Sequence, residues 1–252
     1  SENRGQIVDT TDSQVPSIKF YTQNCNPKLY FSDTAVSYVF FKPDTSSLRR
    51  DSLARVDMGF VNSNSGQKIR PMDKRDDAMN FYLPHRNPVE RVENYNQLVS
   101  FNVWNSVDIV YGSNSNGFKY YFLCKPMGGS SSATQIDLRY YGADSVKIDG
   151  AGQLVIYTKL GRITQPKPAV WQIDANGNFS ALGWQPSYSI VGTNEVKFTG
   201  FGSYNPGLPL VIAIDWGVRS PTQVIQNLEW ATYYGGNGSD LFGRVDVDQV
   251  TG

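Results

Sequence analysis

Residues 107–125, VDIVYGSNSNGFKYYFLCK, carry the pattern that decides the fold. Val107–Tyr111 and Phe118–Lys125 are strand-sized runs rich in β-branched and aromatic residues, and the polar turn Gly112–Gly117 separates them. Two such runs joined by a short turn rich in Gly and Asn predict an antiparallel β-hairpin.

The same alternation of short apolar runs and turn residues extends outward in both directions. Before this hairpin, strands are predicted at Ile18–Thr22, Lys28–Phe31, Ala35–Lys42, Ala54–Val61 and Leu98–Trp104. After it, they are predicted at Gln135–Tyr141, Ser145–Ile148, Gln153–Thr158, Arg162–Thr164, Ala169–Asp174, Phe179–Leu182, Tyr188–Val191, Glu195–Thr199 and Leu210–Ile214. Asp-Gly and Asn-Gly turns at Asp149–Gly152 and Ala175–Asn178 favour hairpins, because these residues accept positive φ.

Helical signals are few. Ser46–Met58 is open between a short helix, a turn and the edge of a strand, and Pro221–Asn227 is a second short candidate. We therefore expect an all-β protein, an antiparallel β-sandwich or partly open barrel of many short strands with few short helices.

Composition excludes several function classes. The 252 residues have a formal net charge of zero, so no basic surplus indicates a nucleic-acid partner. No apolar run approaches the ~18 residues of a transmembrane helix, so no membrane insertion is expected. Two cysteines and a single histidine, none of them in a metal-binding spacing, leave no zinc site of the Cys/His kind.

The domain pattern changes near residue 215. Residues 1–215 are expected to form an all-β module, which could divide into two subdomains near 112–135. Residues 216–227 are expected to be a linker, and residues 228–252 read as the start of a repeat unit. Because repeat units bury their apolar faces against neighbours, Leu228–Val250 should be ordered only where it packs on the body or on a partner.

Several short motifs carry a family resemblance. Trp230, Thr232, Tyr233, Gly235, Gly236, Gly238 and Asp240 resemble the opening of the bacterial β-propeller repeats called SBBP, and Val247, Asp248 and Gly252 fit their continuation. The body resembles the domain of unknown function that precedes such repeats, through Glu2–Gln6, Val107–Tyr111, Ile136–Ala143, Gly152–Thr158, Gly161–Ile163, Gln165–Gln172 and Leu208–Asp215. The sequence departs from that domain at Ala213 and Trp216.

The resemblance implies a secreted or cell-surface protein whose signal peptide has been removed. The start at Glu2–Gln6 is also similar to surface proteins of Bacteroidota that use type IX secretion. The implied partners are downstream repeats or another surface protein. The resemblance supplies no activity.

Catalytic chemistry finds little support. His85 lies in a Pro-rich loop without a nucleophile motif. Paired carboxylates could serve a carbohydrate-active enzyme, and the candidates are Glu90, Glu93, Asp108, Asp137, Glu195 and Asp215. The Gly-rich stretches Met127–Ser132 and Gly235–Gly238 lack the lysine of a phosphate-binding loop. No cofactor is expected.

The run Asp174–Asn178 superficially resembles a calcium loop. It has no glutamate at the twelfth position and no flanking helices, so a hairpin turn is the better interpretation and structural calcium is not supported.

Aromatic and sulfur-containing residues remain. Trp184, Tyr120 and Tyr140 could form a sugar-stacking platform, although aromatic residues of β proteins more often fill the core, as we expect for Trp104 and Trp171. Cys25 and Cys124 could form one disulfide or remain two free thiols.

Three functions follow from these features. The first is a non-catalytic structural or interaction module that orients or caps a repeat array. The second is a glycan- or protein-binding adhesin module, and the third is a carbohydrate-active enzyme that uses paired carboxylates.

Overall fold

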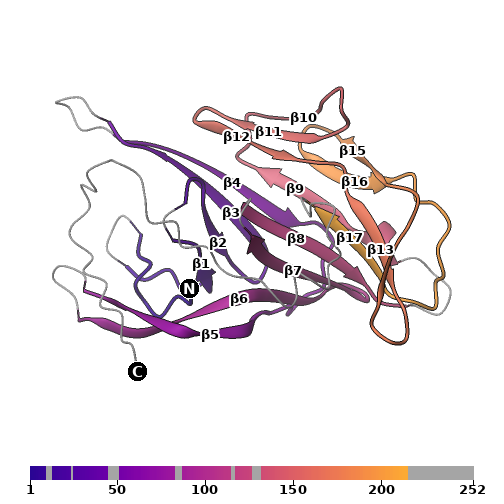
Figure 1. Ribbon diagram of the computed structural model, residues 1–252. Coiled ribbons are helices and arrows are strands. Elements are labelled where there is room, and N and C mark those ends of the chain that lie inside the picture. Colours follow the sequence, from indigo (N-terminus) through magenta and orange to yellow (C-terminus); the bar gives the residue numbers. More distant parts are fainter. Residues whose placement is uncertain are drawn as a thin grey trace.

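A computed structural model describes residues 1–9, 13–23, 25–44, 51–82, 87–114, 117–126 and 132–214. Its strands form two seven-stranded antiparallel sheets and one three-stranded sheet (Figure 1). Among the described residues, one 3-10 turn at Ser132–Gln135 is the helical element, and none of their helices is long and apolar enough to cross a membrane.

The first large sheet, here sheet I, has the strand order β1-β2-β3-β4-β9-β16-β15. Its strands are β1 (Phe20–Tyr21), β2 (Lys28–Phe31), β3 (Ala35–Lys42), β4 (Ser52–Phe60), β9 (Asp137–Tyr141), β15 (Ser187–Val191) and β16 (Glu195–Thr199). The segment Ser46–Met58, which was open between three interpretations, therefore contains the start of a strand.

The second large sheet, here sheet II, has the order β14-β13-β17-β8-β7-β6-β5. Its strands are β5 (Ile69–Phe81), β6 (Val89–Trp104), β7 (Val107–Asn114), β8 (Gly117–Cys124), β13 (Ala169–Ile173), β14 (Phe179–Ala181) and β17 (Leu210–Ile214). The third sheet contains β10 (Ser145–Ile148), β11 (Leu154–Thr158) and β12 (Gly161–Gln165).

The hairpin from which the sequence analysis began is confirmed. Strands β7 and β8 pair antiparallel from Val107 opposite Cys124 to Asn114 opposite Gly117. Successive side chains of β7 point to opposite faces of the sheet. Val107, Ile109 and Tyr111 point into the main core, and the residues between them point away from it.

The main core lies between sheets I and II and is closed by the third sheet. It includes Phe31, Val56 and Leu138 from sheet I, Phe122 and Ile212 from sheet II, and, from the third sheet, Val146, Leu154 and Ile156. The sandwich interpretation is therefore correct, since the sheets are stacked and each keeps free edge strands.

No boundary divides the described chain near residues 112–135. Sheet I combines β1–β4 with β9, β15 and β16, and sheet II combines β5–β8 with β13, β14 and β17. Both halves of the chain therefore contribute to each large sheet and to one core.

Strand β5 and the first half of β6 are not predicted from the sequence pattern. Strand β5 is one of the two edge strands of sheet II, and most of its residues from Arg70 to Asp77 are exposed and charged. Charges on an edge strand discourage pairing with other chains, and they also hide the alternation that marks a half-buried strand.

The turn at Asp174–Asn178 is a hairpin turn between β13 and β14, as expected. One carboxylate oxygen of Asp174 accepts hydrogen bonds from the backbone amides of Asn176 and Asn178, both at 2.8 Å, and the other accepts from the Asn178 side chain. These bonds hold the pKa of Asp174 below its usual value. The carboxylate is thus used to cap the turn.

Candidate functional site

The two tyrosines proposed for a sugar platform lie inside the core. Tyr120 and Tyr140 are buried, and both hydroxyls donate to the side-chain oxygen of Gln165 at 3.1 Å. Burial raises the pKa of both phenols, which therefore stay protonated at neutral pH. Their rings fill the space between the sheets and offer no stacking surface in this structure.

Trp184 is half-buried. Its indole N–H donates to the backbone oxygen of Ser203 at 2.9 Å, and its ring packs against Phe201 and Tyr204. Gly202 makes this packing possible, because a Cβ there would lie 2.5 Å from the indole ring. The indole therefore holds the 201–204 segment in place.

Two of the candidate carboxylates are brought together, on the outer face of sheet I. The ammonium group of Lys197 lies 3.1 Å from Asp137 and 3.6 Å from Glu195, and Arg139 pairs with Glu195 from the neighbouring strand. Burial raises the pKa of Asp137, whereas the Arg139 guanidinium lowers that of Glu195. Directly opposed charges of this kind stabilise neighbouring strands.

The other candidate carboxylates are separate from this pair. Asp108 accepts from the backbone amide of Asn102 at 2.7 Å and pairs with Lys125 at 2.9 Å. The Glu93 carboxylate forms an ion pair with Lys74 and accepts a hydrogen bond from the Tyr95 hydroxyl. The contact with Lys74 is the main cause of the lowered pKa of Glu93. Glu90 lies on β6. Asp215 and His85 lie outside the described residues.

The cysteines are both free. Cys25 is exposed and Cys124 is buried, so the alternative of one disulfide between them is not realised. Burial raises the pKa of the Cys124 thiol to about 12, which leaves it a small apolar core residue. In the described part of the chain, no group of three His, Cys, Asp or Glu side chains is placed to hold a metal ion.

A cleft of about 420 Å³ lies where the N-terminal segment crosses between the two large sheets. The N-terminus is beside β1 in Figure 1, with β2 and β6 on either side of it. The lining comes from residues 2–5, residues 14–16 and 18–20, the β2–β3 turn and the start of β5. None of the site residues expected from the sequence contributes to it.

Residues 2–5 form one wall of this cleft, and side-chain hydrogen bonds within the N-terminal segment hold them in place. Asn3 donates to the backbone oxygens of Val15 and Ile18, and its side-chain oxygen accepts from the amides of Gly5 and Ile7. Gln6, which is buried, accepts from the Arg4 amide and donates to the Glu2 oxygen. Side-chain bonds to the backbone thus replace a regular ladder here.

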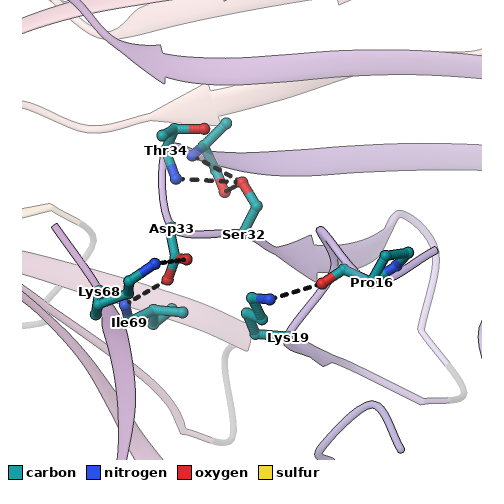
Figure 2. Close-up of polar contacts among 8 residues, drawn as sticks. Pro16, Lys19, Ser32, Asp33, Thr34, Lys68 and Ile69 are labelled. Atoms are coloured by element: carbon teal, nitrogen blue, oxygen red, sulfur yellow. Dashed lines mark hydrogen bonds and ion pairs between the residues drawn. The ribbon is translucent and has the colours of Figure 1, made fainter. Parts of the chain in front are cut away.

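The opposite wall is fixed by Asp33 in the β2–β3 turn. Figure 2 shows its carboxylate reaching across to the start of β5, where it accepts from the Ile69 amide at 2.9 Å and from Lys68 at 3.2 Å. Ser32 closes the same turn, because its hydroxyl oxygen accepts from the amides of Thr34 and Ala35. Asp33 therefore ties sheet I to sheet II beside the cleft.

Two cations at the cleft are bound only by neutral groups. The Lys19 ammonium donates to the Pro16 oxygen at 2.7 Å, and the Arg4 guanidinium donates to the backbone oxygens of Glu90 and Arg91 (Lys19 is drawn in Figure 2). Within the described residues neither cation forms an ion pair. Each keeps N–H donors that can bind a carboxylate of a ligand.

Sequence reasoning missed this site because its parts are far apart in the chain. The opening Glu2–Gln6 was noted only for its resemblance, and Asp33 and Lys68 are 35 residues apart. One local signal was available, since Ser32-Asp33-Thr34 is a turn sequence whose Asp and Ser bond to nearby backbone groups.

The fold and the cleft define a class, an all-β sandwich module with a polar surface cleft at its N-terminal end. The chain belongs to the family described as Domain of unknown function (DUF7948), whose model matches residues 1–213. Comparison with curated proteins and with solved structures gives no significant match.

Proposed function

We propose that this chain is a non-catalytic interaction module whose N-terminal cleft binds an acidic, extended segment of a protein partner. The observation that carries the proposal is the cleft itself, walled by fixed side chains and bearing Arg4 and Lys19, which form no ion pair with any described residue. Val15, Pro16 and Ile18 give the same cleft an apolar strip. Carboxylates beside apolar side chains would match this lining.

A glycan is a less suitable occupant. Sugar recognition commonly uses exposed aromatic faces, and among the described residues that line the cleft the one aromatic side chain, Phe20, is buried in the core. An enzyme of the paired-carboxylate kind has less support still. The cleft does contain Glu2 and Asp33, but Asp33 is engaged with Ile69 and Lys68.

A secreted or cell-surface setting belongs to the same proposal. It is supported by the likeness of Glu2–Gln6 and of the 228–252 segment to surface proteins that carry SBBP repeats. In that setting the downstream repeats or a neighbouring surface protein would supply the acidic segment.

Fluorescence anisotropy with labelled ten-residue peptides tests the proposal. A peptide of alternating Asp and Val should bind, and its Lys/Val and Ser/Val counterparts should not. Arg4→Gln and Lys19→Gln should each weaken binding about fivefold, which corresponds to about 1 kcal/mol for an exposed charge pair. The control Lys159→Gln, at an exposed turn between β11 and β12, should bind like the wild type.

Equal affinity for the three peptides, or acidic-peptide binding that Arg4→Gln and Lys19→Gln leave unchanged, would overturn the proposal. Binding of neutral oligosaccharides in place of the acidic peptide would favour the glycan alternative.

A further inference from the structure

Tyr141 is an aromatic residue on the outside of sheet I. It is the last residue of β9, a strand along which Leu138 and Tyr140 point into the main core. Asp137, Arg139 and Tyr141 therefore point to the opposite, outer face of the sheet. Tyr141 is 48 % exposed, whereas the neighbouring Tyr140 is buried. The ring of Tyr141 is thus available for contact with a ligand.

Two neighbours fix the position of the Tyr141 ring. Gly59 on β4 lies against one edge of the ring, because a Cβ at Gly59 would be 2.8 Å from the ring atom Cε2. Only a residue without a Cβ lets the ring lie this close to the sheet. The guanidinium carbon of Arg139 lies 5.9 Å from the ring centroid. A ring held in this way loses little conformational freedom when a ligand stacks on it.

Three ion pairs lie on the same outer face beside the ring. They join Arg55 to Asp57, Arg139 to Glu195 and Lys197 to Asp137. Asp57 is directly opposite Tyr141 in the strand register, and Glu195 is directly opposite Arg139. We call this surface, made of Tyr141, Gly59 and the six paired side chains, the Tyr141 face. Its three positive and three negative groups leave it without net charge.

The paired groups of the Tyr141 face still reach the solvent. The side chains of Arg139 and Lys197 are 38 % and 41 % exposed. A guanidinium has five N–H donors and a carboxylate can accept several hydrogen bonds, so one ion pair does not use all of them. The face therefore offers fixed donors and acceptors side by side next to an exposed aromatic ring.

A neutral sugar matches these properties better than a nucleic acid or a peptide. A sugar hydroxyl both donates and accepts, and a pyranose ring with equatorial hydroxyls presents a flat C–H surface to an aromatic ring. A nucleic acid would need a surplus of positive charge. An extended peptide would need an unpaired strand edge, and β4, β9 and β16 are each paired on both sides.

We propose that the Tyr141 face binds a neutral oligosaccharide of β-linked pyranose units. One sugar ring stacks on Tyr141, and the adjoining unit forms hydrogen bonds with the Arg139–Glu195 and Lys197–Asp137 pairs. From residue 137 to residue 141 the strand extends ~13 Å, which is long enough for more than one sugar ring. The Tyr141 face shares no residue with the N-terminal cleft, so this site is separate from the one proposed for the acidic segment.

Isothermal titration calorimetry of the full 252-residue chain with cellohexaose, a neutral chain of β-linked glucose, tests this site. Tyr141→Ala should weaken binding about tenfold, and Tyr141→Phe, which keeps the ring, should bind within about twofold of the wild type. Phe101→Ala is the matched control. It removes another exposed aromatic ring, on β6 of sheet II, and should bind like the wild type.

Gly59→Ala tests the position of the ring separately from its presence. The added Cβ would displace the Tyr141 ring, while every polar group of the Tyr141 face remains. Binding of cellohexaose should therefore fall about as much as in Tyr141→Ala. Urea denaturation of each variant checks that the fold is retained.

No binding of cellohexaose by the wild-type chain, or binding that Tyr141→Ala leaves unchanged, would overturn the proposal. Arg4→Gln and Lys19→Gln, which test the N-terminal cleft, should leave cellohexaose binding as in the wild type. If they abolish it while Tyr141→Ala does not, the sugar occupies the cleft and the proposal for the Tyr141 face is wrong.

Discussion

Single residues decide where this chain can turn and pack, and Gly142 is the sharpest case. It follows β9 with φ at +79°, and a Cβ there would lie 2.5 Å from the backbone oxygen of Arg55. Gly192, in the turn between β15 and β16, has φ at +65° but no neighbouring atom within 4 Å of such a Cβ.

Gly142→Ala should therefore destabilise the protein more than Gly192→Ala. In the control Gly192→Ala, backbone strain alone should lower the free energy of unfolding by about 1 kcal/mol. Gly142→Ala adds a clash with a backbone atom, so its free energy of unfolding should fall by about 2 to 4 kcal/mol. Urea denaturation of the two variants measures the difference. Equal losses would mean that the Arg55 strand moves away at little cost.

The two cysteines should differ in reactivity. The thiolate is the reactive form of cysteine, and burial raises the pKa of Cys124 to about 12 while Cys25 is exposed. Iodoacetamide at pH 8 should label one thiol in the folded protein and two in guanidinium chloride. Cys25→Ser should abolish labelling of the folded state, and persistent labelling would show that Cys124 is accessible.

The contribution of Asp137 to the free energy of unfolding should decrease as the pH rises. Burial raises its folded-state pKa above the ordinary value of 3.8, so the folded state binds the proton more tightly than the unfolded state does. Its contribution to stability is then largest at low pH and decreases as the pH rises through the folded-state pKa.

In Asp137→Asn the amide oxygen can still accept from Lys197, but this pH dependence is absent. The stability of the variant relative to the wild type should increase from pH 3.8 upward, as measured by urea denaturation across that range. A difference that stays constant with pH would contradict the assignment.

At the scale of elements, the sequence predicts most strands well where turn chemistry is explicit. The hairpins β10–β11 and β13–β14 follow from Asp149 and Asp174, whose carboxylates accept from backbone amides of their own turns. Strand β5 was not predicted because it is an edge strand and most of its residues are polar. An alternating apolar pattern marks a strand only when one face is buried, and β5 has few buried residues.

The charges of β5 should keep the chain monomeric. Lys74→Val/Asp76→Val leaves the net charge unchanged and removes two exposed charges from edge strand β5 of sheet II. We expect this variant to associate through that edge at concentrations where the wild type stays monomeric, as measured by light scattering. Lys159→Val, which adds one apolar side chain in a turn, is the control, and equal association of both variants would exclude an edge effect.

At the scale of the whole molecule, the assembly depends on contacts that local sequence patterns do not carry. In sheet I, β4 begins at Ser52 and pairs with β9, which begins at Asp137. In sheet II, β8 begins at Gly117 and pairs with β17, which begins at Leu210. The two-layer class follows from strand spacing and alternation alone. The strand order, and with it the cleft, follows only from packing between distant segments.

The same limit explains the outcome for the candidate site. Tyr120, Tyr140 and Trp184 attract attention in the sequence as large aromatic residues, but packing places the first two in the core and the third against Phe201 and Tyr204. The cleft instead uses common residues, such as Asn3, Asp33 and Lys19, that gain significance only from their positions.

The central claim is that the N-terminal cleft binds an acidic segment, and amide chemical-shift mapping of the full chain during titration with the Asp/Val peptide tests it most directly. The account predicts that the largest shifts occur in residues 2–5, 14–16, 18–20 and 68–69, which line the cleft. Shifts confined to another surface, such as the charged face around Asp137 and Lys197, or an absence of shifts at saturating peptide would contradict it.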